Sequence, residues 1–380
     1  TRGAPVSEQR SGPATIYAVA ESAGVSIATV SRVLQGTDRV ASATRDRVLD
    51  AARRLDYLPR GSARALAAKK HEAVGLMLPE LTGPYFAELL VGFETAAADL
   101  GFSVALLMTD EPGLSRPLRQ LAARVDGLAV MARPGQLAED DLGSLARRLP
   151  LIRLAAGDHP DALCTENTGS AHELTAHLFG HGRRRLEFVG DPALAPDAAE
   201  RYAGFVAAHA ASGRTAAAPV RVGFAEADGR RYAQHLLAGP LRPLAEAAEA
   251  GRGSRQPRPA AGTTPRPDGL VCVNDEVAVA LLDELQRAGI AIPEDLAVTG
   301  WDDVMTARYT RPGLTSVAQP VRELGRLAAT RLHELATGGH PAGSTVLPTR
   351  IVIRGSCGCP EERPMPAGGT RPGPTKEEPR

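Results

Sequence analysis

The 380-residue sequence lacks the features of membrane, secreted and nucleotide-dependent proteins. No apolar run reaches the roughly eighteen residues that a membrane helix needs, and the N-terminal region has no signal-peptide core. No G-x-G-x-x-G or P-loop motif follows a predicted strand, and no Ser/His/Asp arrangement recurs at strand ends; His177 and His181 are interpreted as helix-surface or capping residues. We therefore expect a cytoplasmic protein that is not an enzyme, uses no cofactor and has no membrane partner.

Cysteine is also scarce, and four cysteines are too few for a disulfide scaffold. Cys164 and Cys272 lie in apolar, strand-like contexts in which a buried thiol is expected. Cys357 and Cys359 form a C-x-C pair near the end of the chain. Because the sequence offers no second ligand pair beside them, no metal site is predicted.

The formal net charge is zero, but the charges are unevenly distributed. Residues 1–70 carry 12 Lys/Arg and 6 Asp/Glu, whereas the rest of the chain carries 32 Lys/Arg and 38 Asp/Glu. This division is expected if only the N-terminal part meets a polyanion. The length suits two or three domains with a large buried core.

Residues 14–59 show the pattern of a helix-turn-helix. Apolar and small residues recur at helical spacing from Ile16 to Ala23, stop at Gly24, and resume from Val25 to Leu34. Gly24 suits the left-handed conformation that ends a helix, and Ser26 can cap the second helix. In a helix-turn-helix the second helix enters the DNA major groove. A generic pair of antiparallel helices is the competing interpretation.

A third helix and a linker are predicted next. The helix covers residues 43–56, with an apolar face made of Val48, Leu49, Ala52 and Leu55. The basic, alanine-rich residues 60–71 are too few for a stable isolated helix and are predicted to be a flexible linker. Two copies paired on DNA would let this linker fold there, with Leu66 in the minor groove and Arg60 and Arg64 on phosphates.

The predicted DNA-binding side chains of the second helix lie off its packing face. Arg32 can bind guanine or a phosphate, and Thr29 and Ser31 suit phosphates or base edges. Ile27 and Ala28 offer only apolar contact. The predicted DNA-binding set is Thr15, Tyr17, Ser26, Ile27, Ala28, Thr29, Ser31, Arg32, Arg60, Ala63, Arg64 and Leu66.

From residue 72 the pattern alternates between strands and helices. Strands are predicted at 74–79, 102–108, 126–132, 151–155, 185–190, 220–224, 269–274 and 296–301, and helices at 84–100, 168–179, 197–211, 276–288 and 321–337. This alternation predicts parallel sheets covered by helices on both faces, and the number of strands favours an α/β core of two doubly wound lobes over residues 72–356. Residues 239–267 are predicted to be a flexible insertion, and residues 1–13 and 357–380 to be disordered.

Several motifs, taken in order, resemble those of the lactose/galactose repressor (LacI-type) family of bacterial regulators. They include VAESAGVSIATVSRVLQG, GPYFAELLVGFETAAADLGF, HLFGHGRRRLEFVGD, ERYAGF, VNDEVAVALL and IPEDLAVTGWDD. The resemblance covers Thr15 to about Ser356, except the insertion. It implies a homodimeric or tetrameric repressor on a pseudopalindromic operator, with a core like that of periplasmic sugar-binding proteins. Ile27, Ala28 and Arg32 match operator-reading positions, and Leu66 matches the hinge leucine that enters the minor groove.

The resemblance also implies an effector between the two lobes. Arg201 of ERYAGF would bind a hydroxyl or carboxylate, and the residues that follow the core strands would line the cleft. The predicted effector-binding set is Tyr85, Phe86, Arg201, Phe224, Asn274, Asp275, Trp301 and Asp302. Aromatic rings with charged groups suit a sugar. Asp275, just before a predicted helix, could instead be only a helix cap.

The sequence leaves the effector class and the assembly open. A sugar would act as an inducer, whereas a nucleoside or phosphorylated metabolite would act as a co-repressor. A solute-binding sensor without a DNA role is a further possibility, which the basic N-terminal part argues against. No leucine heptad follows residue 359, and this favours a dimer over a tail-assembled tetramer. Bound to its operator, the protein would be associated with the nucleoid.

Overall fold

A computed structural model describes residues 15–34, 40–57, 71–109, 111–156, 162–250, 266–340 and 343–360. The chain divides after His71 into two compact units. The predicted disordered residues 1–13, nearly all of the predicted linker and residues 361–380 lie outside the described part. None of the described helices combines the length and the apolar character that a membrane span requires.

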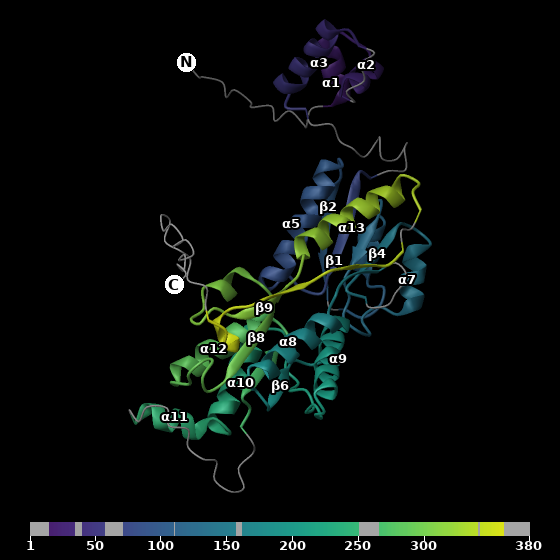
Figure 1. Cartoon of the computed structure of the whole chain (residues 1–380). Helices are drawn as coiled ribbons and strands as arrows, with labels where there is room; N and C mark the ends of the chain where they lie inside the picture. The colour runs from purple at the N-terminus through teal and green to yellow at the C-terminus, as the bar shows by residue number, and fades with distance from the viewer. Residues whose placement is uncertain are drawn as a thin grey trace, which may run out of the picture. The chain divides into compact units, whose positions relative to one another are not determined.

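The N-terminal unit, which we call the head, contains the predicted helix-turn-helix. Its helices are α1 (Ile16–Ala23), α2 (Ile27–Leu34) and α3 (Ser42–Arg54) (Figure 1). The Thr15 hydroxyl accepts a hydrogen bond from the Ala18 amide at 3.3 Å, and Gly24 ends α1 with φ of 62°. The small interior of the head is formed by Val19, Ala20, Ala23, Val30, Val33, Val48, Ala51 and Ala52.

The third helix differs from the prediction in two details. It ends at Arg54, two residues earlier than expected, and Leu49 is 39% exposed instead of buried. Ala51 is buried in place of Leu49. The packing face therefore runs through Val48, Ala51 and Ala52. The small alanine side chains allow α3 to pack closely against α1.

The first lobe of the second unit is built on a parallel sheet. Its strand order is β10-β5-β4-β3-β1-β2, with bounds β1 (Ala73–Leu78), β2 (Ser103–Met108), β3 (Leu128–Val130), β4 (Leu151–Leu154), β5 (Ala162–Thr165) and β10 (Thr345–Leu347). Strand β1 alternates its side chains between two layers, as its period of two requires. Leu76 packs under α5 (Gly83–Asp99) and α13 (Val321–Ala336), and Met77 packs toward α6 (Arg116–Ala122) and α7 (Glu139–Ala146).

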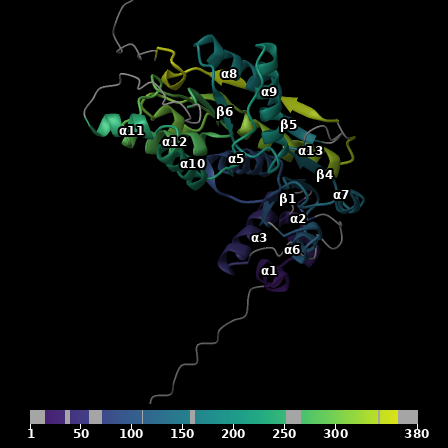
Figure 2. The ribbon, with the colours of Figure 1, turned by 90° about the horizontal axis from the view of Figure 1, so that it is seen from below.

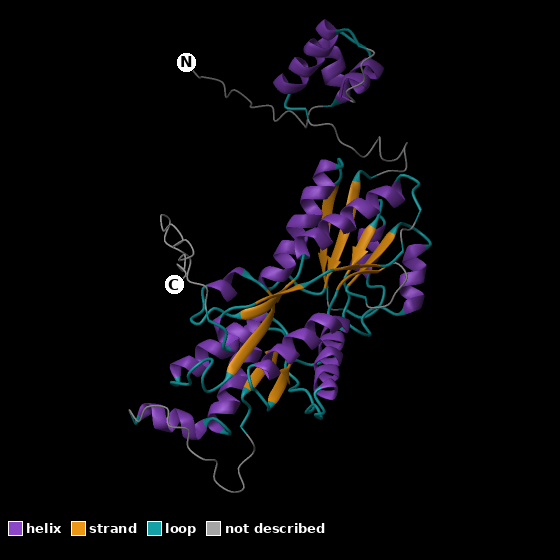
Figure 3. Ribbon diagram, viewed as in Figure 1, coloured by secondary structure: helices purple, strands orange, loops and turns teal. Residues whose placement is uncertain are grey.

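The second lobe has a five-stranded sheet in the order β11-β9-β8-β7-β6, in which only β11 is antiparallel. The strands are β6 (Leu186–Val189), β7 (Gly269–Cys272), β8 (Ala297–Asp302), β9 (Thr315–Ala318) and β11 (Arg350–Val352). Helices α8 (Thr168–Gly180) and α9 (Pro196–Ala211) lie on one side of β6, and α10 (Glu226–Ala238) and α12 (Asp275–Arg287) on the other (Figure 2). The core is thus the predicted pair of α/β lobes, and Figure 3 shows the two groups of strands with helices around each.

The chain passes between the lobes three times, between β5 and α8, between β9 and α13, and between β10 and β11. We call these passages the lobe crossings; they are residues 166–167, 319–320 and 348–349. The Thr349 hydroxyl donates to the Glu166 backbone oxygen at 2.9 Å, and the Thr165 hydroxyl is hydrogen-bonded to the Gln319 side chain. The three crossings therefore lie side by side and form the joint between the lobes.

Some predicted segments are wrong. Residues 220–224 form no strand and contribute only an isolated bridge from Val220 to Val189. The prediction of a flexible insertion is wrong over residues 242–249, which form the helix α11 (Arg242–Glu249) with Leu244 buried. The prediction of disorder from residue 357 is wrong for Cys357, which ends the short helix η2 (Gly355–Cys357) packed on the second lobe. Cys164 and Cys272 are buried, as predicted.

Helices α5 and α13 approach closely because glycine occupies both sides of their contact. A β-carbon on Gly325 would lie 2.1 Å from the Leu89 backbone oxygen, and one on Gly92 would lie 1.9 Å from the Arg322 backbone oxygen. A real β-carbon cannot approach a backbone atom so closely. The contact therefore joins a helix near the start of the first lobe to a helix that follows strands β6 to β9 of the second lobe in sequence.

We predict that Gly325→Ala destabilises the protein by about 1–3 kcal/mol, because the new methyl group must push two helix backbones apart. Gly143→Ala is the matched control. Gly143 lies in α7, where a β-carbon would meet only the end of the Arg147 side chain at 3.5 Å. Alanine there should stabilise by about 1 kcal/mol. Urea unfolding of the three proteins measures both effects, and an unchanged stability in Gly325→Ala would contradict the tight contact.

Candidate functional site

The second helix of the head presents a solvent-facing side that contains three of the predicted DNA-binding residues. Val30 and Val33 are buried, whereas Ile27, Ala28 and Arg32 are exposed. On α1, Tyr17 is 69% exposed. The predicted linker residues Arg60, Ala63, Arg64 and Leu66 lie outside the described residues.

Three of the predicted DNA-binding side chains have local roles in the head. Thr15 caps α1. Ser26 Oγ accepts the Thr29 amide hydrogen bond at 3.2 Å, and the two hydroxyl oxygens lie 3.0 Å apart. These bonds satisfy amides at helix starts. They also hold the start of α2 in one conformation, which would present its exposed side chains as a rigid set.

A cavity of about 450 Å³ lies between the two lobes of the core. Both lobes contribute to its lining, which includes Glu80, Tyr85 and Arg133 of the first lobe and Asp197, Arg201 and Asp228 of the second. Its size falls in the range of small-molecule pockets, which is roughly 300–1,000 Å³. It also lies at the carboxyl ends of the strands, where open α/β sheets bind their ligands.

Six of the eight predicted effector residues line this cavity: Tyr85, Phe86, Arg201, Phe224, Asn274 and Asp302. The rings of Tyr85 and Phe86 meet edge to face with centroids 5.3 Å apart. Asn274 caps α12 by accepting the Val277 amide hydrogen bond at 3.0 Å, and its side-chain amide donates to the Phe224 backbone oxygen at 2.8 Å. Aromatic surfaces and polar groups therefore converge on one space.

Arg201 is the best-fixed polar group of the cavity. Its Nε donates to Asn167 Oδ1 at 2.9 Å, and Nη1 donates to the Val273 backbone oxygen at 2.8 Å. Its guanidinium carbon lies 4.6 Å from the centroid of the Trp301 ring. Since Asn167 belongs to a lobe crossing, the same guanidinium touches the cavity and the joint between the lobes.

Asp275 and Trp301 do not line the cavity, so the prediction that they contact the effector directly is not supported by their positions. Asp275 is fully buried, and its carboxylate accepts hydrogen bonds from the Ser316 hydroxyl at 2.7 Å and the Val304 amide at 2.9 Å. Trp301 is 1% exposed and lies behind Arg201. Both residues support the site from the interior of the second lobe.

Asp197 is a cavity residue that the sequence pattern did not predict; it is 9% exposed. Its Oδ2 lies 3.6 Å from Nη2 of Arg201, one helical turn away on α9. Oδ1 is buried and has no hydrogen-bond partner among the residues that the structure describes. Burial raises the pKa of Asp197, and the neighbouring Arg201 opposes this shift. The i,i+4 spacing from Arg201 was the available sequence signal.

The charged lining of the cavity is mainly acidic. Among the described lining residues, five are carboxylates and two are arginines: Glu80, Asp197, Asp228, Glu276 and Asp302 against Arg133 and Arg201. Burial, with repulsion from Glu80 and Glu226, raises the pKa of Glu276. The acidic lining thus disfavours the binding of a negatively charged ligand.

Asp302 links the cavity to another lobe crossing. Its Oδ1 accepts a hydrogen bond from the Gln319 side-chain amide at 2.5 Å, and its backbone has φ of 109°, which is rare for a residue other than glycine. Burial raises the pKa of Asp302 to about 7, against the opposing effects of Arg201 and the Gln319 hydrogen bond. Backbone strain of this kind often accompanies a functional position.

A helix-turn-helix head joined to a two-lobed core with a polar cleft defines a class of DNA-binding regulators. Residues 15–60 match the family model of bacterial regulatory proteins of the lacI family, and residues 71–243 match that of periplasmic binding proteins and the sugar-binding domain of the LacI family. A model of the periplasmic binding protein-like domain also matches residues 175–357. The chain belongs to the LacI family of bacterial transcriptional repressors.

Similar proteins agree with this assignment. The chain is 31% identical to the HTH-type transcriptional repressor PurR of Photobacterium profundum, over 84% of this chain and 91% of that protein. It is 28% identical to the repressor CytR of Escherichia coli K12, over 90% and 96%. A lac repressor dimer bound to operator and an anti-inducer has a similar fold (TM-score 0.76, 24% identity, 91% and 99% covered). The relatives are repressors, so the chain is a regulator and not an enzyme.

We predict a pH-dependent stability from Asp302. An unfolded aspartate has a pKa of about 3.9, so between about pH 4 and pH 7 the folded protein holds more protons at this site than the unfolded chain does. The stability that Asp302 contributes should therefore fall as pH rises through this range, by at most about 1.4 kcal/mol per pH unit.

Asp302→Asn removes the titrating group. The difference in free energy of unfolding between the parent protein and Asp302→Asn should change across that range and level off above about pH 8. Urea titrations at constant ionic strength measure it. A difference that stays constant with pH would show that burial does not perturb this carboxyl group.

Proposed function

We propose that this protein is a cytoplasmic repressor that binds a pseudopalindromic operator as a homodimer and leaves it when a neutral polyhydroxylated molecule, such as a sugar, binds between the lobes. The observation that carries the effector proposal is the buried Oδ1 of Asp197, which has no partner in the described part of the chain and lies beside Arg201. A buried acceptor without a donor is costly. A ligand hydroxyl group would supply the missing donor.

The lining chemistry supports a neutral effector over a phosphorylated one. Phosphate sites use clustered arginines and open helix N-termini. Here the first turns of α5 and α9 contain Pro84 and Pro196, which lack an amide donor, and α9 and α10 place Asp197 and Asp228 in their first turns. A dianion would therefore meet carboxylates where it needs donors.

The aromatic lining suits the apolar C–H face of a sugar ring. Tyr85, Phe86 and Phe224 supply flat surfaces, and Arg201, Asn274 and Asp302 supply hydrogen-bonding groups around them. One similar structure is a complex of the transcriptional regulator CelR with cellobiose; that chain is 26% identical with a TM-score of 0.59, with 90% of this chain and 99% of that chain covered. A neutral nucleoside, which also combines a flat ring with hydroxyl groups, is the second candidate.

Two hydrogen bonds offer a path from effector to operator. Arg201 is bonded to Asn167, and Asp302 is bonded to Gln319, so two of the three lobe crossings contact side chains of the cavity. An effector that binds these groups better in one lobe arrangement shifts the population toward it. The linker before residue 72 would carry that change to the head.

Homodimer formation is supported by apolar side chains left on the surface of the first lobe. Val91 of α5 and Leu106 and Met108 of the edge strand β2 are 44%, 36% and 52% exposed. A second copy covering them would bring two heads together, and paired heads match the two half-sites of a palindrome.

The proposal is tested by selecting bound sequences from a random duplex pool with the full-length protein, alone and with a panel of sugars, nucleosides and sugar phosphates. We expect a palindrome whose enrichment collapses with a neutral sugar. Asp197→Asn should select the same palindrome but need a higher sugar concentration for release. A palindrome released only by a nucleoside or a phosphate, or retained better with one, would refute the sugar effector. No enriched sequence would refute operator binding.

We predict that Arg32→Ala weakens operator binding by about 1–3 kcal/mol and removes the preference at one base pair in each half-site, because Arg32 is exposed on α2 and suited to guanine. Arg53→Ala is the control, since it removes the same charge from the exposed side of α3. It should leave the base preference intact. Binding to operators mutated at single positions distinguishes the two; a uniform loss for Arg32→Ala would assign it to a phosphate instead.

A further inference from the structure

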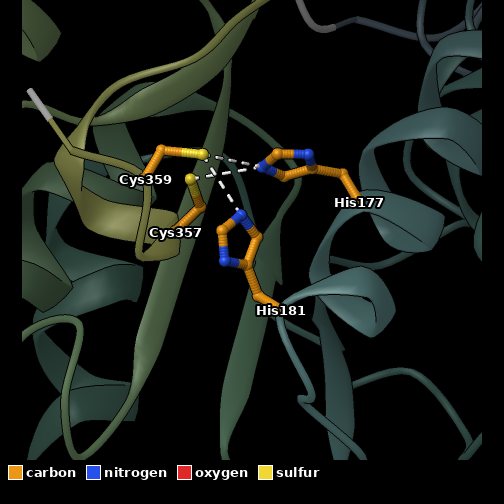
Figure 4. A group of neighbouring side chains, drawn as sticks. All are labelled: His177, His181, Cys357 and Cys359. Carbon is orange, nitrogen blue, oxygen red and sulfur yellow. Dashed lines mark hydrogen bonds between the residues drawn. The ribbon is translucent and has the colours of Figure 1, made fainter. Parts of the chain in front are cut away.

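Two histidines and two cysteines meet where the end of α8 faces the C-terminal segment of the core. His177 lies in the last turn of α8 and His181 directly follows the helix, while Cys357 ends η2 and Cys359 is two residues further on. Their candidate ligand atoms, two ring nitrogens and two sulfurs, all lie within 4.8 Å of one another. Figure 4 shows the four side chains pointing toward a common centre.

The separations match the edges of a tetrahedral zinc site. With Zn–S of about 2.3 Å and Zn–N of about 2.0–2.1 Å, sulfur and nitrogen ligands lie about 3.6 Å apart. Nε2 of His177 lies 3.4 Å from the Cys357 sulfur and 3.6 Å from the Cys359 sulfur. Nε2 of His181 lies 3.1 Å from the Cys359 sulfur.

Hydrogen bonding alone accounts poorly for this group. A neutral imidazole carries one N–H, yet Nε2 of His177 is within reach of two sulfur atoms. Thiols are weak donors and weak acceptors, so they gain little by gathering around two rings. A cation at the centre would use all four atoms at once.

The four ligands come from rigid parts of the second lobe. His177 and His181 are separated by one helical turn and so lie on one face of the helix end. Ser356, next to Cys357, accepts the Thr315 amide hydrogen bond at 2.9 Å and donates to the Val298 backbone oxygen at 2.5 Å, which fixes the segment on the sheet. Gly358, with φ of 111°, turns the chain so that both cysteines can face the same centre.

We infer that His177, His181, Cys357 and Cys359 bind a structural Zn²⁺ ion. Two thiolates and two imidazoles suit zinc and exclude the oxygen-preferring Ca²⁺ and Mg²⁺. Four protein ligands fill the tetrahedral shell, which leaves no position for a substrate and makes the site structural. His181 is the C-cap of α8 and His177 lies in its last turn, as the sequence predicted, and zinc binding would give both a further role.

The location gives the ion a specific task. Helix α8 begins just after the first lobe crossing, and the cysteine segment follows β11, which begins just after the third. An ion between them would link α8 to the segment after β11. These are two of the three chain segments that connect the second lobe to the joint. Removing the ion should therefore loosen the C-terminal segment without unfolding the sheet, because none of the four ligands lies in a strand.

The first test uses the full-length protein purified under reducing conditions without chelators. We expect about one zinc per chain by elemental analysis, and a lower melting temperature after prolonged dialysis against a strong chelator, restored by adding zinc alone. Replacement by Co²⁺ should give intense thiolate-to-cobalt charge-transfer absorption together with the visible bands of a tetrahedral site. Protein that takes up neither ion in stoichiometric amount would overturn the proposal.

Variants then identify the ligands. Cys359→Ser and His181→Gln lie at the more accessible side of the group, so they should fold while binding zinc at least about tenfold more weakly and losing part of the cobalt absorption. His172→Gln, on the same helix and outside the group, is the matched control and should bind as the parent does. Unchanged zinc affinity and cobalt spectra in folded Cys359→Ser and His181→Gln would show that these four residues are not the site.

Discussion

A buried guanidinium has five N–H donors and keeps its positive charge. The structure around it must therefore supply hydrogen-bond acceptors in fixed positions. Arg201 is 5% exposed, and its acceptors come from separate parts of the second lobe: Asn167 at a lobe crossing, the Val273 backbone after β7, and Asp197 on its own helix. The cavity, the sheet edge and the joint between the lobes are thus fixed relative to one side chain.

The sequence predicted the parts of the fold that local periodicity determines. The helix-turn-helix depends on neighbouring residues, since Gly24 and Ser26 set its turn and caps. The central strands were recognisable because they are apolar on both faces. The sequence pattern does not reveal strands β10 and β11, because they are three residues long and partly exposed. Residues 220–224 have the apolar pattern of a strand, but in the structure they pack on the sheet and make only a single bridge to it.

The sequence predicted only part of the candidate site, because local pattern does not show which residues the fold brings together. The rule that ligands bind at strand ends found Asn274 and Asp302 but could not separate them from Asp275, whose carboxylate turns inward to Ser316. Asp197 was missed because it follows no core strand, and only its pairing with Arg201 brings it to the cavity. The histidine and cysteine pairs are about 180 positions apart in the chain, and only the folding of the C-terminal segment onto α8 joins them.

The position of α13 and β10 late in the sequence has a consequence for folding during synthesis on the ribosome. The first lobe starts the core in sequence, yet its sheet lacks an edge strand and α5 lacks its covering helix until the chain has been made to residue 347. The second lobe has strands β6 to β9 in one continuous stretch, and only its antiparallel edge strand β11 is made later. Nascent chains should therefore expose the apolar side of α5 until α13 has been made, so the first helix of the core is covered only late in translation.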